Sequence, residues 1–160
     1  MENRQIVVFK LMGHEFGVDI KKVLEILNYE SVRPVPDAPN YIDGIINVRG
    51  TVYLVFNLRK RLNMSPIEEI DGTKFILLYL KENKVGLLVD SVCEILSVQE
   101  EAIERAPQVI EKNKVSCIDY IVKQDNRMIV VLNIDAILSG EENLFVQGVS
   151  DEEDYCSNAE

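Results

Sequence analysis

Apolar residues occur in short runs that polar segments separate, and four of these runs are apolar without alternation. They span residues 6–9, 52–56, 75–78 and 128–132. Short apolar runs bounded by turn residues predict β-strands, and the lack of an apolar–polar alternation predicts burial on both faces of each strand. We therefore expect a mainly β protein whose strands are covered on two sides.

The segments between neighbouring runs predict four β-hairpins. Their turns are expected at residues 12–15, 49–51, 81–84 and 124–127. Residues 33–40 contain three prolines, which fix φ and remove backbone donors, so this segment predicts a stiff extended loop.

Two segments that follow the first hairpin of each half have helical spacing. Apolar residues at i, i+3, i+4 and i+7 predict a short helix in each, with Asp19 and Asp90 placed as N-caps. The spaced residues are Ile20, Val23, Leu24 and Leu27 in the first segment and Val89, Val92, Cys93 and Leu96 in the second.

The second half of the chain repeats the first. Residues 5–27 align without a gap on residues 74–96, and residues 41–62 align on residues 117–138. The offset between the halves grows from 69 to 76, which indicates a seven-residue insertion around residues 99–114. Such a repeat predicts two halves of one design.

We expect one domain over residues 1–140 that consists of two barrel halves, about 5–66 and 74–138. This division allows strands to be exchanged between the halves. A strand with two apolar faces fills a barrel with one face and needs cover on the other, and the second barrel can supply that cover. The expected fold class is therefore mainly β, with two five-stranded barrels that share an apolar layer and carry short helices.

Composition and charge narrow the function. The chain has 160 residues, of which 47% are apolar, and a net charge of −10. Residues 141–160 hold seven acidic residues and no Lys or Arg, so the other 140 residues carry only −3. A nucleic-acid binder or a polybasic membrane surface would need a basic field. We expect protein partners, no nucleic acid, no direct membrane insertion, and a disordered acidic tail over residues 141–160.

No apolar run is long enough to span a bilayer, and the N-terminus lacks a secretory signal pattern, so a cytoplasmic protein is expected. The three cysteines are an odd number without metal-ligand spacing, which predicts neither zinc nor a disulfide framework. We expect Cys93 and Cys117 to be small buried hydrophobic residues and Cys156 to be exposed. His14 is the single candidate base and has no nucleophile nearby, so no catalytic residue and no enzymatic activity are expected.

Positions that differ between the halves are available for a binding site. The Arg49–Gly50 turn has Asp125 and Asn126 as its counterpart in the second half. An arginine stays protonated and offers a fork of donors, so on a rigid turn it favours recognition of carboxylate or carbonyl groups over chemistry. The alternative is an ordinary solvated turn residue. The repeated glutamate Glu25, matched by Glu94, is as consistent with a structural role as with docking.

The order of FGVDIKKVLEIL, a proline-rich loop, YIDGIINVRGTVYLVFNLRKRL, VGLLVDSVCEIL and MIVVLNIDAIL resembles the CheW family of chemotaxis coupling proteins over about residues 4–139. This resemblance implies two intertwined SH3-like barrels, no catalysis, no cofactor and no metal. It also implies a scaffold that couples transmembrane chemoreceptors to the histidine kinase CheA and is recruited from the cytoplasm to membrane-associated receptor arrays. The alternative is a CheW-like regulatory domain of a CheA or CheV relative.

The resemblance also places two binding surfaces. A groove between the barrels would receive the cytoplasmic tip of a chemoreceptor (a methyl-accepting chemotaxis protein), and the barrel ends would contact the CheA regulatory domain. For Val23 and Val92, ordinary core packing is an equally good interpretation. The implied groove residues are Ile20, Val23, Glu25, Gly44, Asn47, Arg49, Gly50, Val89 and Val92. The implied kinase contacts are Met12, Gly13, Gln124, Asp125, Asn126 and Arg127.

Overall fold

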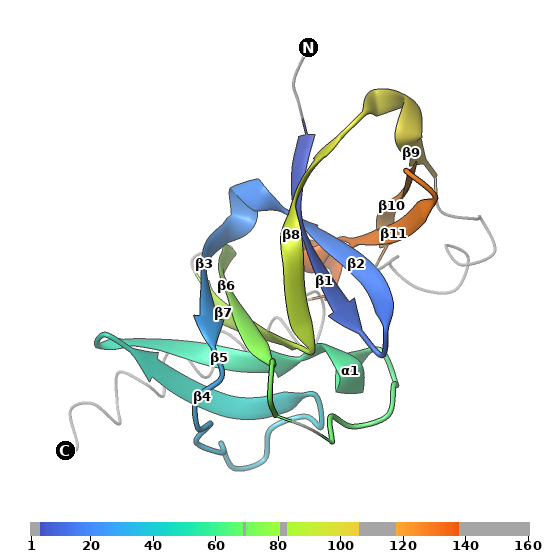
Figure 1. Cartoon of the computed structure of the whole chain (residues 1–160). Helices are drawn as coiled ribbons and strands as arrows, with labels where there is room; N and C mark the ends of the chain where they lie inside the picture. The colour runs from blue at the N-terminus through green and yellow to red at the C-terminus, as the bar shows by residue number, and fades with distance from the viewer. Residues whose placement is uncertain (1–3, 69, 81–82, 106–117, 138–160) are drawn as a thin grey trace.

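The computed structural model describes residues 4–68, 70–80, 83–105 and 118–137. In these residues the protein is mainly β, as predicted (Figure 1). The strands are β1 (Arg4–Leu11), β2 (His14–Asp19), β3 (Val23–Asn28), β4 (Ile42–Val48), β5 (Thr51–Asn57), β6 (Lys74–Leu80), β7 (Asn83–Val89), β8 (Ser91–Val98), β9 (Ile103–Glu104), β10 (Ile118–Gln124) and β11 (Arg127–Leu132). The helical elements are single turns, namely η1 (Ile20–Lys22), α1 (Leu58–Arg61), η2 (Glu100–Ala102) and α3 (Ile134–Ile137).

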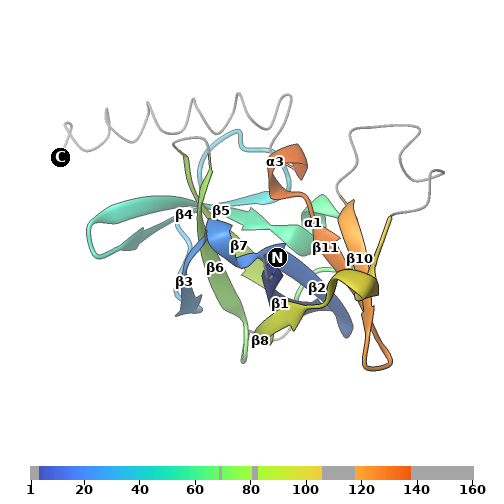
Figure 2. The ribbon, with the colours of Figure 1, turned by 90° about the horizontal axis from the view of Figure 1, so that it is seen from above.

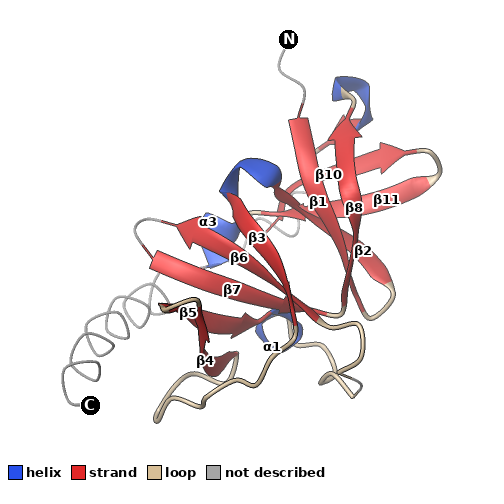
Figure 3. Ribbon diagram, turned by 60° about the vertical axis from the view of Figure 1, so that its left-hand side comes forward, coloured by secondary structure: helices blue, strands red, loops and turns tan. Residues whose placement is uncertain are grey.

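The strands form two sheets, and each sheet contains strands from both halves of the chain (Figure 3). The six-stranded sheet has the order β8-β1-β2-β11-β10-β9, and the five-stranded sheet has the order β3-β6-β7-β5-β4. The first hairpin of each half therefore pairs with the other half, because β2 lies parallel to β11 and β7 lies parallel to β5. The sixth strand, β9, comes from the insertion, which explains why one sheet exceeds the expected five strands.

The strands without alternation are buried on both faces because they separate two apolar layers. On β1, Ile6 and Val8 face the interior of the six-stranded barrel, whereas Val7 and Phe9 face a central layer. All four side chains are at most 1% exposed. Strand β6 divides in the same way between the central layer and the interior of the five-stranded barrel. The predicted shared apolar layer is thus confirmed, and each fully buried side chain of this size contributes about 1.5–3 kcal/mol.

Three predicted hairpins have two-residue turns whose two residues both have positive φ. The turns are Met12–Gly13 (φ 52° and 79°), Arg49–Gly50 (50° and 85°) and Asp125–Asn126 (54° and 61°). Left-handed geometry at both positions is that of a type I′ turn, which matches the twist of the flanking strands. In the fourth hairpin, between β6 and β7, the turn residues 81–82 lie outside the described residues.

The two predicted helices are wrong. Residues 20–28 form one 3-10 turn and then β3, and residues 91–98 form β8. Only the cap is confirmed, since the Asp19 side chain accepts a hydrogen bond from the Lys21 N–H (2.9 Å). A short apolar run fits the 3.6-residue period of a helix and the two-residue period of a strand equally well. These two segments are strands because β3 pairs with β6 and β8 pairs with β1.

The expected burial of Cys93 is also wrong, because this residue is exposed on β8. Strand β8 lies at the edge of its sheet, so its side chains have one neighbouring strand instead of two. Partial burial of the thiol nevertheless raises the pKa of Cys93 above its ordinary value. Cys117, Cys156 and the acidic tail lie outside the described residues.

Candidate functional site

Arg49 lies on the tip of the β4–β5 hairpin and is held there by two neighbours. The Gly50 N–H donates a hydrogen bond to Asn47 Oδ1 (2.9 Å), which closes the turn. The Arg49 guanidinium donates through Nη2 to Glu25 Oε1 on β3, and this hydrogen bond raises the pKa of Arg49. The Arg49 side chain is 70% exposed, so it presents a fixed positive charge at the surface.

This ion pair joins the two edges of the five-stranded sheet. Strands β3 and β4 lie at opposite ends of the strand order, yet Glu25 and Arg49 meet. A backbone bridge between Arg33 and Ile45 closes the same barrel, with N···O distances of 2.9 and 2.8 Å. The sheet therefore curls until its edges touch, which places Asn47, Arg49 and Glu25 at one surface.

Gly44 has a packing role at this closure. Its φ is +146°, and a Cβ at this position would lie 2.0 Å from the Arg33 carbonyl oxygen. Its backbone is buried, and it has no side chain to present to a partner. Glycine is required here because the two backbones approach too closely for any side chain.

The apolar members of the expected groove lie at or next to the two crossings between the sheets, on η1, β3, β7 and β8. Ile20, Val23 and Val92 are half-buried and pack against the central layer, whereas Val89 is fully buried within that layer. Val89 thus supports the surface from beneath. These positions join residues from both halves of the repeat around one apolar cluster.

Sequence reasoning missed two exposed apolar residues on β3. Leu24 is 55% exposed and Ile26 is 39% exposed, on the strand face opposite to Glu25. The helical spacing places Leu24 on one apolar face with Ile20, Val23 and Leu27 and does not single out Ile26. A two-residue period would have placed Leu24 and Ile26 together on one face.

The two segments implied as kinase contacts lie at the same end of the six-stranded sheet. Strands β2 and β11, which follow the Met12–Gly13 and Asp125–Asn126 turns, are parallel neighbours. Arg127 donates to both carboxylate oxygens of Glu15 (3.1 and 2.6 Å) and pairs with Glu94 (3.1 Å). This network ties the two turns together.

The Arg127–Glu15 ion pair is partly buried, and each partner shifts the pKa of the other. The hydrogen bond from Arg127 lowers the pKa of Glu15, and the same bond raises the pKa of Arg127.

Two exposed methionines lie in or next to the two turns. Met12 is 45% exposed, and Met128, two residues after the Asp125–Asn126 turn, is 59% exposed. Flexible apolar methionine side chains suit adaptable protein contacts. Gln124 instead bonds to the backbone of Gln99 and Ser97 and so has a structural task.

The two hairpins that carry Arg49 and Asp125–Asn126 project away from each other. The tip of the β4–β5 hairpin and the tip of the β10–β11 hairpin project at opposite ends of the molecule in both views (Figures 1 and 2). The first belongs to the five-stranded sheet and the second to the six-stranded sheet. One partner at each tip would not need to exclude the other.

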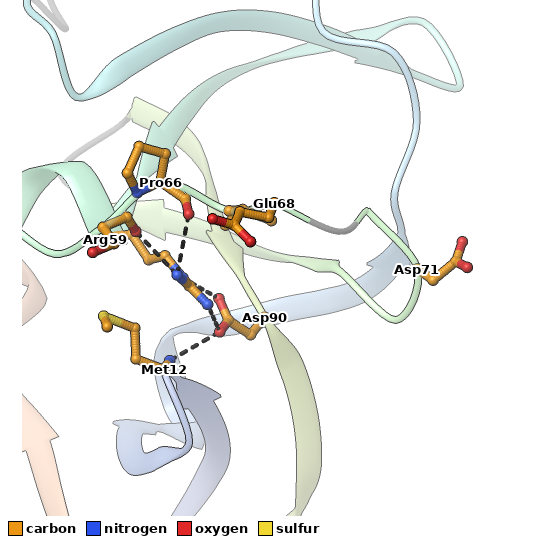
Figure 4. Close-up of a pocket in the computed structure, with 8 residues that line it drawn as sticks. Met12, Arg59, Pro66, Glu68, Asp71 and Asp90 are labelled. Atoms are coloured by element: carbon orange, nitrogen blue, oxygen red, sulfur yellow. Dashed lines mark hydrogen bonds and ion pairs between the residues drawn. The ribbon is translucent and has the colours of Figure 1, made fainter.

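A third cluster, which sequence reasoning did not find, joins Arg59, Asp90 and Met12 (Figure 4). Arg59 donates through Nε to Asp90 Oδ1 (2.7 Å) and through Nη2 to Asp90 Oδ2. Its Nη1 donates to the carbonyl oxygens of Ser65 (3.0 Å) and Pro66 (3.3 Å). Asp90 Oδ2 also accepts from the Met12 N–H (2.9 Å). No local pattern signals these contacts, because they join segments 31 and 78 residues apart.

The repeat contains a second ion pair between a short helix and a crossing, with the two charges exchanged. Asp135, on α3, corresponds to Arg59 on α1, and Asp135 pairs with Lys22 at 2.5 Å. Lys22 and Asp90 lie in the two segments that cross between the sheets. Each crossing is thus fastened to a short helix by one ion pair, with the positive charge on the helix in one case and on the crossing in the other.

In the part of the chain that the structure describes, no group of three His, Cys, Asp or Glu side chains is placed to hold a metal ion. His14, the single candidate base, is exposed at the start of β2. No helix in the described residues has both the length and the apolar character that a membrane crossing requires.

Comparison with known proteins gives consistent results. A family model described as a CheW-like domain matches residues 5–142. The chain is 35% identical to the chemotaxis protein CheW of Bacillus subtilis over 86% of this chain and 88% of that protein. It is 32% identical to the chemotaxis protein CheW of Treponema pallidum over 88% of this chain and 85% of that protein.

A solved structure agrees with the fold. The crystal structure of the scaffolding protein TtCheW from Thermoanaerobacter tengcongensis superposes with a TM-score of 0.80 at 29% sequence identity. The match covers 88% of this chain and 96% of that protein. The SH3-like two-barrel architecture is therefore common to both.

Proposed function

This chain belongs to the CheW family and acts as a chemotaxis adaptor, and from that premise we propose that it couples chemoreceptors to the histidine kinase CheA without catalysing a reaction itself. It would bind the cytoplasmic tip of a receptor and the kinase regulatory domain, and it would be recruited from the cytoplasm to receptor arrays. The curated CheW relatives are covered over 85% and 88% of their own length. This coverage favours an adaptor over a regulatory domain of a CheA or CheV relative.

The observation that carries the proposal is the separation of two hairpin tips, the Arg49–Gly50 turn of the β4–β5 hairpin and the Asp125–Asn126 turn of the β10–β11 hairpin. An adaptor has to hold two proteins at once, so its binding surfaces must not overlap. Arg49 and Glu25 lie on the five-stranded sheet, whereas the Met12–Gly13 and Asp125–Asn126 turns lie on the six-stranded sheet. The tips of the β4–β5 and β10–β11 hairpins project at opposite ends of the molecule, which favours simultaneous binding of two partners (Figure 2).

The receptor surface combines a fixed cation with apolar side chains. A helical receptor tip would lay its apolar side chains against Ile20, Val23 and Val92, which are half-buried on the central layer. Within the described residues, the Arg49 guanidinium bonds through Nη2 alone, so its other N–H groups can reach carbonyl or carboxylate groups of the receptor. Because Gly50, Asn47 and Glu25 hold the turn and the guanidinium, Arg49 can fix the register of the bound helix.

The kinase surface is formed by the two turns that the Arg127–Glu15 pair holds together. Met12 and Met128 provide exposed apolar area there, and the turn residues Asp125 and Asn126 are also exposed. An apolar centre with a polar rim is the usual composition of a protein–protein interface.

Two binary binding experiments test the proposal. The full chain is titrated calorimetrically with a receptor cytoplasmic fragment and, separately, with the CheA regulatory domain. Saturable binding to both is expected. The isolated nucleotide-binding domain of CheA serves as the control and should not bind. Failure to bind either the receptor fragment or the regulatory domain would remove the adaptor role.

A further inference from the structure

Asp90 occupies an unusual place in the fold. It lies in the crossing between β7 and β8, directly after the buried Val89 and two residues before Val92. Its carboxylate reaches the turn between β1 and β2, where it accepts the Met12 N–H at 2.9 Å. One side chain thus connects the crossing beneath the expected receptor groove to a turn at the expected kinase surface.

The carboxylate is held on its other side by Arg59. Two hydrogen bonds from the guanidinium fix both oxygens, and the side chains of Arg59 and Asp90 are only 15% and 19% exposed. The Ser65 and Pro66 carbonyl oxygens hold the guanidinium in turn. Water therefore competes weakly for these groups, and the carboxylate has one orientation in which to meet the Met12 N–H.

The matched ion pair of the repeat does not have this second task. Lys22 and Asp135 fasten the other crossing, but a lysine ammonium has no acceptor for a backbone N–H. Lys21, the residue at the position that matches Asp90, is exposed. An ion pair that only fastened a crossing to a short helix could carry its acid on either of the two elements. Contact with the Met12 N–H, by contrast, requires the acid at position 90, in the crossing.

We propose that Asp90 is a positioning residue for the kinase-binding turn: its carboxylate fixes the Met12–Gly13 turn, and Arg59 fixes the carboxylate. This inference rests on the proposed function, because it assumes that the turn contacts the kinase. Met12 is 45% exposed and has φ of +52°, so its side chain depends on the backbone of the turn for its direction. An anchored backbone presents that side chain to a partner at a lower entropic cost.

The experiment uses three variants of the full chain. D90A removes both the ion pair and the acceptor for the Met12 N–H. R59D/D90R keeps opposite charges at the two positions but places no acceptor beside Met12. D135A removes the matched pair with Lys22 and serves as the control. Each variant is titrated with the CheA regulatory domain and with a receptor cytoplasmic fragment, and exchange of the Met12 amide hydrogen is followed by NMR.

We expect D90A to bind the kinase domain about tenfold more weakly, as loss of one charge-assisted hydrogen bond implies, and to exchange the Met12 amide faster. The loss of receptor affinity should be smaller than the loss of kinase affinity, and D135A should keep its kinase affinity. R59D/D90R should regain thermal stability relative to D90A without regaining kinase affinity.

Recovery of kinase affinity in R59D/D90R would overturn the proposal, because the pair would then act only as a fastening between segments. Unchanged kinase affinity in D90A would overturn it as well. If D90A does not fold, the double variant alone decides. The proposed function fails if the wild-type chain does not bind the kinase domain while its Met12 amide is protected from exchange. In that case the contact between Asp90 and the Met12 N–H is real, but it positions no kinase-binding turn.

Discussion

Glu25 and Arg49 form an ion pair between the two edge strands of the five-stranded sheet, with Glu25 on β3 and Arg49 at the end of the β4–β5 hairpin. The pair bridges the two edges of the barrel and at the same time holds a guanidinium at its surface. The sequence predicted Arg49 on a hairpin turn but left the role of Glu25 open. The structure gives Glu25 a structural partner, and any receptor contact that Arg49 makes would be oriented by this pair.

Replacement of Arg49 tests this orientation. In R49A the fold should be retained and the melting temperature nearly unchanged, because an exposed ion pair contributes little to stability. The affinity for a receptor fragment should fall about tenfold, since a charge-assisted contact is lost. Calorimetric titration measures the affinity.

The matched control for R49A is K123A. Lys123 also forms an exposed ion pair, with Glu104 at 3.3 Å, but on the six-stranded sheet. This variant should bind the receptor fragment like the wild type. Equal affinities for wild type, R49A and K123A would contradict the role of Arg49.

Gly44 should be the glycine at which substitution is most damaging at this closure. In G44A the Cβ would lie 2.0 Å from the Arg33 carbonyl oxygen at a φ of +146°, so the variant should lose about 3 kcal/mol or more of unfolding free energy. In G50A, at φ +85° with no atom within 4 Å of the added Cβ, the loss should be about 1 kcal/mol. Denaturant unfolding measures both, and a smaller loss in G44A than in G50A would show that the closure is misplaced.

Much of the fold could be predicted because the relevant signals are local. Two-residue turns, two-sided apolar strands and the repeat are all visible within a few neighbouring residues or by aligning the halves. The pairing of β2 with β11 and of β7 with β5 could not be read from the sequence. It depends on contacts between segments far apart in the chain, and the apolar pattern of a strand does not indicate which strand it pairs with.

The errors have the same origin. Residues 23–28 have a pattern that fits a helix as well as a strand. Pairing with β6 makes them a strand, and the paired residues lie 46 to 55 positions further along the chain. The sequence neighbours of Asp90 predict a helix cap at this position. Its partners are Met12 and Arg59, and they become visible only in three dimensions.

The Glu15–Arg127 pair should make stability depend on pH. The pKa of Glu15 is lower in the folded state than its ordinary value, so the pair stabilises the fold above that ordinary value, near 4.5, and the stabilisation is lost as the pH falls through the lowered pKa. At pH 7, the free energy of unfolding of E15Q should be about 1 kcal/mol lower than that of the wild type.

The difference between E15Q and the wild type should shrink toward zero in acid. Denaturant titrations between pH 7 and pH 3 measure it, and R127Q provides the control, because E15Q should have a smaller effect in that background. A difference that grows as the pH falls would have the wrong sign and would contradict the assignment.

Cys93 should react with a thiol reagent in the native protein. In a C117S/C156S background, labelling with a disulfide reagent should proceed without denaturant, because Cys93 is exposed on the edge strand β8. The rate should rise with pH through values above the ordinary thiol pKa, since partial burial raises the pKa of Cys93 and the thiolate is the reactive form. Labelling that requires unfolding would show that β8 is covered.

The most direct test of the adaptor role is formation of a ternary complex. The chain is mixed with a receptor cytoplasmic fragment and the CheA regulatory domain, and the mass of the product is measured by size-exclusion chromatography with light scattering. Because the tips of the β4–β5 and β10–β11 hairpins lie at opposite ends of the molecule, one complex that contains all three proteins is predicted. Displacement of the kinase domain by the receptor fragment would contradict separate surfaces and, with them, the proposed coupling.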